Sequence, residues 1–292
     1  MRGNEADHEL VAPGSLPAVL DLLASAPGQW MPIAGGTELM VAFAAGRLSA
    51  NKLVSIWGVA ELRFTDSSPN TLAIGAGTTF SDMRSNALIS AEFPLLSRAA
   101  SWIGSIANQA RATLGGNLVN GSPAADSSPA LLVYDAEIEL ISVRGKRRMP
   151  YSEFHTGYKQ NAMTADELLY AVHLPRRFAQ HRQYLRKVGT RKAMAISKVA
   201  LSATALMKDG LIDEIRVAAA SLAPFPARLT KTEKALAGKA PGADVIQAAR
   251  HALLAEAQSI DDIRSNAQYR KVVGANLLEE FLHSLCRESE TG

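Results

Sequence analysis

One stretch decides the fold: residues 112–134 read ATLGGNLVNGSPAADSSPALLVY. It contains a single charged residue, Asp126, among 23 positions, and small residues surround that acid. The apolar run that ends at Tyr134 predicts a helix beginning near Pro123. A carboxylate in such neutral surroundings needs hydrogen-bond donors, because an unpaired buried charge is costly. Asp126 is therefore expected to be either a helix cap or loop anchor, or an acceptor for a hydroxyl or amide of a ligand.

Two glycine pairs lie at expected junctions between a strand and a helix. Gly35 and Gly36 follow the short apolar strand 31–34 and precede a helix expected over 38–45, and a second pair, residues 115–116, opens the uncharged stretch. Glycine lets a backbone approach a ligand closely and lets N–H groups converge, which suits a phosphate. Either pair alone is also typical of a tight turn. Together they favour a dinucleotide held between two loops, with no room for a Cβ at Gly35 or Gly115.

The common nucleotide-binding fingerprints do not fit. Residues 75–80, GAGTTF, begin like a Rossmann signature but have Phe80 in place of the third glycine, which helix–strand contact requires. The absence of Gly-x-x-x-x-Gly-Lys-Ser/Thr excludes a P-loop kinase or ATPase. No Gly-x-Ser-x-Gly or paired-carboxylate motif indicates a hydrolase.

Composition excludes several further classes. Hydrophobic residues make up 47% and charged residues 20% of the 292 positions, as in ordinary globular proteins. No apolar run approaches the ~18–20 residues of a membrane span. The single cysteine, Cys286, cannot form a disulfide, a cysteine zinc site or an iron–sulfur cluster within the chain. The first residues lack the apolar segment of a secretory signal, so we expect a cytoplasmic protein.

Basic residues are distributed unevenly around a net charge of +3. Residues 176–192 contain seven Lys or Arg and no acid, and residues 144–148 contain four. A solvated hairpin, an acidic or phosphate-bearing partner, or nucleic acid would each suit such runs, but no nucleic-acid-binding motif accompanies them. Lys187 is accordingly either a surface cation or a group that offsets negative charge on a ligand.

Strands and helices alternate irregularly, which predicts an α+β fold. After Pro175 the pattern predicts three antiparallel strands, with a hairpin turn at Asp209-Gly210 between the second and third. Helices are expected at 230–237, 244–257 and 267–285. The basic stretch 175–182 is the expected boundary between domains 1–176, with subdomains of about 1–58 and 59–176, and 177–292.

The ordered set of motifs resembles the FAD-binding subunit of molybdenum-containing hydroxylases, the family of xanthine dehydrogenase and carbon monoxide dehydrogenase flavoproteins. The motifs are AGGTEL (34–39), TLGGN (113–117), SPAAD (122–126), FHTGY (154–158), DELL (166–169), KVGTR (187–191), DDIR (261–264) and YR (269–270). They extend over about residues 8–285. The resemblance implies a two-subdomain FAD-binding domain of the vanillyl-alcohol-oxidase or PCMH type, followed by a three-stranded antiparallel sheet with a helix bundle.

The resemblance also implies which residues contact the cofactor, with the pyrophosphate and ribityl chain held by two loops. The positions that match are Ile33, Ala34, Gly35, Gly36, Thr37, Glu38, Leu39, Met40, Ile103, Thr113, Leu114, Gly115, Gly116, Asn117, Asp126, Leu169 and Lys187. Residues 109–112 read QARA where Gln-Ile-Arg-Asn is usual, and Ile103 replaces a phenylalanine of animal xanthine oxidases. Because no histidine or cysteine lies in a flavin-linking context, we expect non-covalent FAD. No catalytic residue or metal ligand is assigned.

The function implied is that of an oxidoreductase subunit that transfers electrons. They would arrive one at a time from [2Fe-2S] clusters on an iron–sulfur small subunit, with molybdopterin on a large subunit, and leave to NAD⁺, a quinone or oxygen. FAD suits this task because it can hold one electron or two. The alternatives are a stand-alone FAD-dependent oxidase or dehydrogenase of the same fold, and a basic binding module without enzymatic activity. Neither a nucleic-acid partner nor a membrane span is expected.

Overall fold

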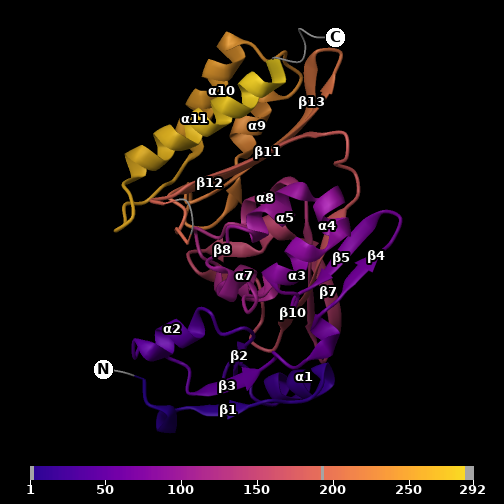
Figure 1. Cartoon of the computed structure of the whole chain (residues 1–292), viewed down its shortest axis with the longest axis vertical. Coiled ribbons are helices and arrows are strands. Elements are labelled where there is room, and N and C mark those ends of the chain that lie inside the picture. The colour runs from indigo at the N-terminus through magenta and orange to yellow at the C-terminus, as the bar shows by residue number, and fades with distance from the viewer. Residues whose placement is uncertain (1–2, 192–193, 287–292) are drawn as a thin grey trace.

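The computed structural model describes residues 3–191 and 194–286, arranged as three units along the long axis of the molecule (Figure 1). The basic run identified in the sequence ends at Lys192, which lies outside the described residues. The arginines at its start pair with acids of the same chain, Arg176 with Glu92 and Arg177 with Glu214. No described helix has the length and apolar character needed to cross a membrane.

The N-terminal unit is a three-stranded parallel sheet in the order β1-β3-β2. Its elements are β1 (Glu9–Val11), α1 (Leu16–Ser25), β2 (Met31–Ile33), α2 (Leu39–Ala44) and β3 (Lys52–Ser55), flanked by the short 3₁₀ helices η1 (Glu5–Asp7) and η2 (Ala60–Leu62). Ser15 caps α1, which buries Leu16, Val19 and Leu23 against the sheet, as its helical spacing predicts. By contrast, α2 is apolar yet has no buried residue.

The middle unit is a five-stranded antiparallel sheet in the order β4-β5-β10-β6-β7. Its strands are β4 (Thr65–Ser67), β5 (Thr71–Gly75), β6 (Glu137–Ser142), β7 (Gly145–Pro150) and β10 (Leu168–Pro175). Six short helices cover one face: α3 (Phe80–Ser85), α4 (Ala87–Glu92), α5 (Pro94–Ala100), α6 (Ile106–Gln109), α7 (Leu114–Asn120) and α8 (Ser128–Val133). The largest hydrophobic core of the described chain fills the space between them.

The helix expected from near Pro123 is shorter than its sequence pattern indicated. It begins only at Ser128, and every residue from Ser128 to Val133 is buried. The preceding residues form turns and bends that lead past Asp126. A further short connection contains η3 (Tyr151–Glu153) and the hairpin of β8 (His155–Gly157) and β9 (Gln160–Asn161).

The C-terminal unit corrects one expectation, because its antiparallel sheet has four strands rather than three. The order is β11 (Arg182–Val188), β12 (Val199–Lys208), β13 (Leu211–Ala220) and β14 (Ala227–Arg228). The fourth strand pairs Ala227 with Ala219 and is only two residues long, too short to produce an alternating pattern. The Asp209-Gly210 turn is confirmed, with φ of 50° and 74°.

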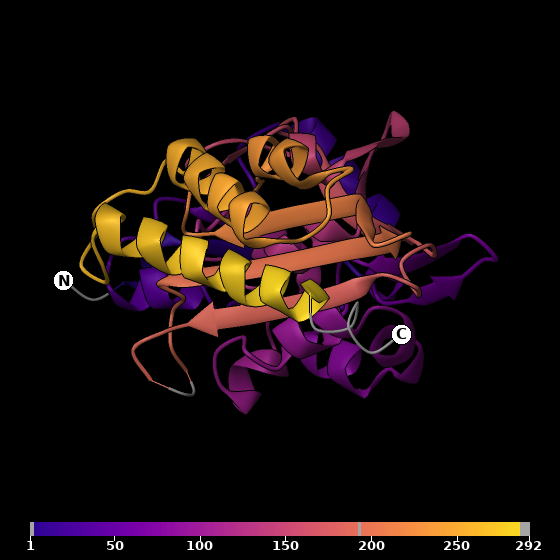
Figure 2. The same ribbon diagram turned by 90° about the horizontal axis from the view of Figure 1, so that it is seen from above.

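Three helices cover the outer face of this sheet: α9 (Thr230–Leu236), α10 (Ala243–Glu256) and α11 (Ala267–Cys286) (Figure 2). The inner face packs on α8, where the Thr204 hydroxyl on β12 donates to the Val133 carbonyl at 3.4 Å. The buried helix α8 therefore joins the middle and C-terminal units. This arrangement is the α+β fold that the sequence predicts.

Candidate functional site

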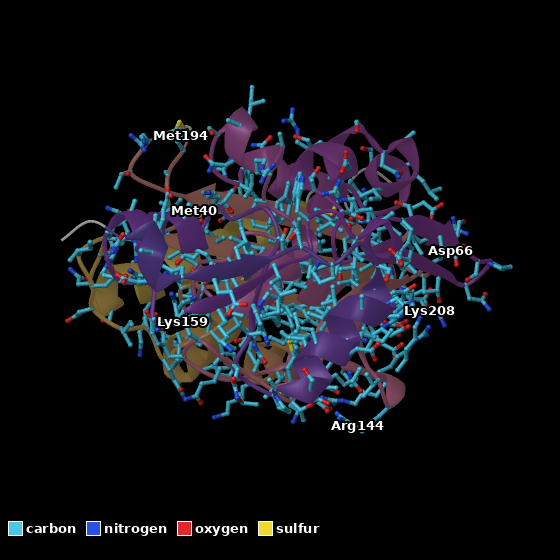
Figure 3. All side chains as sticks on the ribbon, turned by 90° about the horizontal axis from the view of Figure 1, so that it is seen from below. Met40, Asp66, Arg144, Lys159, Met194 and Lys208 are labelled. Carbon is cyan, nitrogen blue, oxygen red and sulfur yellow. The ribbon has the colours of Figure 1, made fainter. Side chains whose placement is uncertain are left out.

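A cavity of about 470 Å³ lies where the three units meet, within the range of about 300–1,000 Å³ typical of ligand pockets. Its wall is made by segments that are distant in sequence: Glu38, Ile103, Gly104, Asn117, Asn120, Ser122–Asp126, Tyr158, Lys159, Met194–Ser197, Ser221, Ala223, Ile260, Asp262, Arg264 and Arg270. Figure 3 shows Met40, Lys159 and Met194 on one side of the molecule, opposite Asp66 and Lys208.

Asp126 lines the cavity and forms a buried ion pair with Lys187, which is not among the lining residues. Lys187 Nζ donates to Asp126 Oδ2 at 2.5 Å and to the Trp102 carbonyl at 3.1 Å, and Ser197 Oγ donates to the other carboxylate oxygen. Asp126 is 7% exposed, and the Lys187 side chain is 11% exposed. Asp126 therefore anchors its loop through Lys187 and Ser197 and does not cap α8, and Lys187 is not a surface cation.

The charge of Asp126 depends on these two donors. Burial raises the pKa of Asp126 above its usual value, because desolvation penalises the carboxylate, whereas Lys187 and Ser197 oppose that shift. Ser197 is fully buried and was not identified from the sequence. A serine before an apolar strand carries no local signal that it will reach an acid 71 positions earlier.

The first glycine loop, residues 34–39, presents unused hydrogen-bond donors. Within the described chain, none of its six backbone N–H groups donates a hydrogen bond, although the Met40 N–H closes the turn on the Gly36 carbonyl at 2.9 Å. Gly36 has a φ of 74°, which a residue with a side chain adopts only under strain. A run of unused N–H groups in such a turn forms a concavity that favours an anion. Of this loop, Glu38 lines the cavity.

The second glycine loop, residues 113–117, uses its donors within the chain. The N–H groups of Leu114 and Gly115 donate to the carbonyls of Thr78 and Ala76, at 3.0 and 2.8 Å. Those of residues 116 and 117 donate back to Thr113. Of this loop, Asn117 lines the cavity, and its Oδ1 accepts a hydrogen bond from the Ser127 hydroxyl at 2.7 Å.

Both glycine loops are tightly packed against the chain itself, so the chain alone leaves no room for a Cβ at Gly35 or Gly115, and the contacts of these glycines with FAD stay a prediction. A Cβ on Gly35 would lie 1.7 Å from the Arg111 carbonyl oxygen, and one on Gly115 would lie 2.7 Å from the Ala76 Cβ. The close approach of backbone segments therefore requires both glycines, whether or not a ligand is bound.

Of the other positions predicted to contact FAD, some line the cavity and others do not. Ile103 lines the cavity beside Gly104. Leu169 is 4% exposed in the core of the middle unit and is not among the lining residues. Of the two loops, Glu38 and Asn117 line the cavity, whereas the other residues from Ile33 to Met40 and from Thr113 to Gly116 are not among its lining residues. Their roles as FAD contacts stay predictions.

Backbone strain is concentrated at the cavity. Five described non-glycine residues have a positive φ, and three of them line it: Lys159 (53°), Met194 (54°) and Ser221 (66°). Such conformations persist where the surrounding structure enforces them, and they cluster at functional sites. Ser221 is held by its N–H to the Pro123 carbonyl at 2.8 Å and by its hydroxyl to the Ser197 carbonyl.

The donor set and the shape of the site fit a dinucleotide that carries an aromatic ring system. Unused N–H groups at one edge suit a pyrophosphate, and the Asn117 side chain and the Asp126–Lys187 pair offer polar groups to a hydroxylated chain or a pyrimidine edge. Apolar side chains, Ile103, Ile196 and Ile260, complete the wall. About half of the lining residues are polar or charged, so the wall is mixed and offers partners to the hydroxyls and phosphates of such a ligand.

Comparisons with known proteins agree with this geometry. The family model of the FAD binding domain in molybdopterin dehydrogenase matches residues 6–177, and that of the CO dehydrogenase flavoprotein C-terminal domain matches residues 184–285. The xanthine dehydrogenase FAD-binding subunit of Escherichia coli O157:H7 is 31% identical over 258 residues, covering 88% of each chain. The carbon monoxide dehydrogenase medium chain of Hydrogenophaga pseudoflava is 25% identical over 276 residues, covering 94% of this chain and 96% of the relative.

Solved structures show the same fold. Carbon monoxide dehydrogenase from Hydrogenophaga pseudoflava, in a form lacking the Mo-pyranopterin moiety, superposes with a TM-score of 0.91 at 26% identity, covering 96% of this chain and 97% of that one. Quinoline 2-oxidoreductase from Pseudomonas putida 86 shares the fold with a TM-score of 0.88 at 21% identity, covering 96% and 97%. The chain therefore belongs to the family of FAD-binding flavoprotein subunits of molybdopterin dehydrogenases, oxidoreductases of the xanthine and carbon monoxide dehydrogenase type.

Proposed function

We propose that this chain binds FAD non-covalently in the cavity and transfers electrons from [2Fe-2S] clusters on an iron–sulfur small subunit to an external acceptor. One observation carries the proposal: the wall of a 470 Å³ cavity contains both Glu38, from the loop with unused N–H groups, and the buried Asp126, which Lys187 and Ser197 hold in place. FAD, when bound, supplies the ability to take up and release electrons singly or in pairs.

The residues of the chain have distinct tasks in this proposal. The first glycine loop binds the diphosphate through its N–H groups. Asn117 and Asp126 orient the polar parts of the cofactor, and Lys187, which donates to Asp126 at 2.5 Å, opposes the rise in the pKa of Asp126 that burial causes. The apolar wall around Ile103 limits the access of water to the ring system.

Two features of the chain support the presence of partner subunits: it has a single cysteine, and it exposes large apolar side chains near the cavity. Its one cysteine cannot hold an iron–sulfur cluster, and the relative from Hydrogenophaga pseudoflava is named a medium chain, which implies a smaller and a larger chain. Large apolar side chains lie exposed at the cavity wall and beside it: Tyr158, Met194, Ile196, Ile260 and the fully exposed Ile263. We propose this rim as the docking surface of the iron–sulfur small subunit, with the molybdopterin large subunit attached through it.

The first experiment is a visible absorption spectrum of the purified chain, followed by denaturation and chromatography of the released cofactor. We expect a yellow protein that releases FAD. A protein reconstituted with excess FAD that remains colourless, or that releases FMN alone, would overturn the proposal.

A second measurement separates an electron-transfer subunit from a stand-alone oxidase. The isolated chain is expected to reduce dyes with NADH, if NAD⁺ is its acceptor, but not to hydroxylate xanthine, aldehydes or N-heterocycles. If NADH reduces no dye, the protein is photoreduced and then mixed with a quinone or with oxygen. The compound that reoxidises the flavin identifies the acceptor. Hydroxylation of any of these substrates by the pure chain would refute the subunit role.

A further inference from the structure

Residues 109–112, which read QARA, have no role in the function described so far. Arg111 belongs to the middle unit, where its backbone N–H donates to the Asn108 carbonyl of α6 at 3.0 Å. Two residues later, Thr113 begins the second glycine loop and caps α7. The end of α6 and the start of α7 therefore fix the backbone of Arg111 directly before the second glycine loop.

The side chain of Arg111 contacts the N-terminal unit at two points. Its guanidinium stacks on the Trp57 ring, with Cζ 4.0 Å from the ring centroid, and its Nε–H donates to the Gly35 carbonyl at 3.4 Å. The parallel neighbours β2 and β3 pair Ile33 with Ser55. Gly35 and Trp57, each two residues farther along, therefore lie at the same carboxyl edge of the sheet. Arg111 thus joins the first glycine loop to the segment that precedes the second.

Stacking on Trp57 is the principal contact of this guanidinium. A cation over an aromatic ring is attracted by the negative face of the ring, and tryptophan attracts it most strongly. Arg63 stacks on the same ring, with Cζ 4.1 Å from the centroid, and also donates to the Trp57 carbonyl at 2.7 Å. Both of these contacts of Arg63 are with Trp57, so they join no second glycine loop. The two arginines therefore differ in what they connect, although they stack on one ring.

We propose that Arg111 is a positioning residue for FAD, because its contacts with Trp57 and Gly35 set the distance between the two glycine loops. This inference rests on the proposed function, in which the first loop binds the diphosphate and Asn117 of the second loop orients polar parts of the same cofactor. A ligand that spans two units binds more tightly when the units already have the spacing that it requires, since less freedom is lost on binding.

The test is a titration of the apo-protein with FAD in three forms: wild type, Arg111→Gln and Arg63→Gln. Arg63→Gln is the matched control, because it removes a guanidinium from the same ring and leaves the link between the loops in place. We expect Arg111→Gln to weaken FAD binding about two- to fivefold, as the loss of one exposed cation–π contact predicts, while Arg63→Gln binds FAD as wild type does. Equal FAD affinity in all three forms, or equal weakening in both variants, would overturn the inference.

Riboflavin separates the spacing of the loops from general damage to the cavity. It lacks the diphosphate and therefore does not need the first glycine loop, so we expect Arg111→Gln to bind riboflavin as wild type does. A loss of riboflavin and FAD affinity by the same factor would overturn the positioning role. A wild-type chain that binds no FAD would instead refute the proposed function.

A double-mutant cycle tests whether the contact with Trp57 carries the effect. Trp57→Leu removes the ring, and we expect the double variant with Arg111→Gln to bind FAD no more weakly than the weaker single variant. Losses of FAD affinity that multiply would show that the two residues act separately, which would overturn the link. Thermal melting of each apo form checks that it is folded. Should Trp57→Leu fail to fold, the comparison of Arg111→Gln with Arg63→Gln decides.

Discussion

At the candidate site, Asp126 and Lys187 each compensate the cost of burying the other's charge. They are 61 positions apart, and each lies where its charge would be costly alone. A carboxylate paired at 2.5 Å and held by Ser197 keeps one orientation. Such a pair contributes less to stability than to the position of the groups that a ligand meets.

Replacement of Gly35 by alanine tests the finding that the chain itself requires this glycine. The new Cβ would lie 1.7 Å from the Arg111 carbonyl oxygen, so a backbone segment must shift. We expect the apo-protein to lose more than about 2 kcal/mol of stability, measured by chemical denaturation without FAD. Gly58→Ala is the control, because nothing lies within 4 Å of its Cβ position. Unchanged stability of Gly35→Ala together with lost FAD binding would show instead that contact with FAD requires this glycine.

At the scale of elements, the β6–β7 hairpin is attached to the turn before β10 by ion pairs. Arg144 binds Asp166, and Arg147 binds Glu167 at 2.6 Å. Hydrogen bonds from Arg144 and Thr164 lower the pKa of Asp166 from 3.8 to about 2. These contacts fix an edge strand that would otherwise be exposed on both sides.

The lowered pKa of Asp166 predicts a pH dependence of stability. A carboxyl group whose pKa is lower in the folded state stabilises the fold above its unfolded pKa, and that contribution is lost as the pH falls. For Asp166 the loss is expected between pH 3.8 and about 2. Asp166→Asn should therefore be less stable than wild type near neutral pH, and the difference should vanish at the acid end of this window. Denaturation curves at several pH values measure it, and a difference independent of pH would contradict the assignment.

At the scale of the whole molecule, α8 and the residues beside it hold the middle and C-terminal units together. Asp135, which follows α8, accepts hydrogen bonds from Arg177, Arg216 and Arg228, which come from the connection between the units and from β13 and β14. The cavity lies at the other end of this segment, beside Asp126. The division into domains 1–176 and 177–292 stays a prediction that limited proteolysis can test.

Asp135→Asn tests whether this cluster stabilises the contact between the units. Asparagine tolerates the φ of 48° at this position, so the change removes the charge and keeps the backbone. We expect a loss of about 1–3 kcal/mol and weaker FAD binding, because two walls of the cavity belong to different units. Asp209→Asn is the matched control: it has a φ of 50°, and no described ion pair includes Asp209. Equal stability of both variants would show that the cluster is dispensable.

Elements that depend on near neighbours could be predicted from the order of the residues alone. Helical spacing after Ser15 predicted α1, Asp209-Gly210 predicted a hairpin, and the ordered glycine motifs predicted the family. The sequence also singled out Asp126 and Lys187, since a lone acid in a neutral stretch is visible locally. Turn chemistry and periodicity act over a few residues, and a single sequence contains them in full.

Contacts between distant residues became visible only in the folded chain. Ser197 reaches Asp126 across 71 positions, β14 is too short to leave a pattern, and Gly35 is required by a carbonyl 76 positions later. The same holds for the cavity, whose lining residues come from segments as distant as Glu38 and Arg270. Contacts of this kind depend on the packing of distant segments, and no local property of the residues specifies their partners.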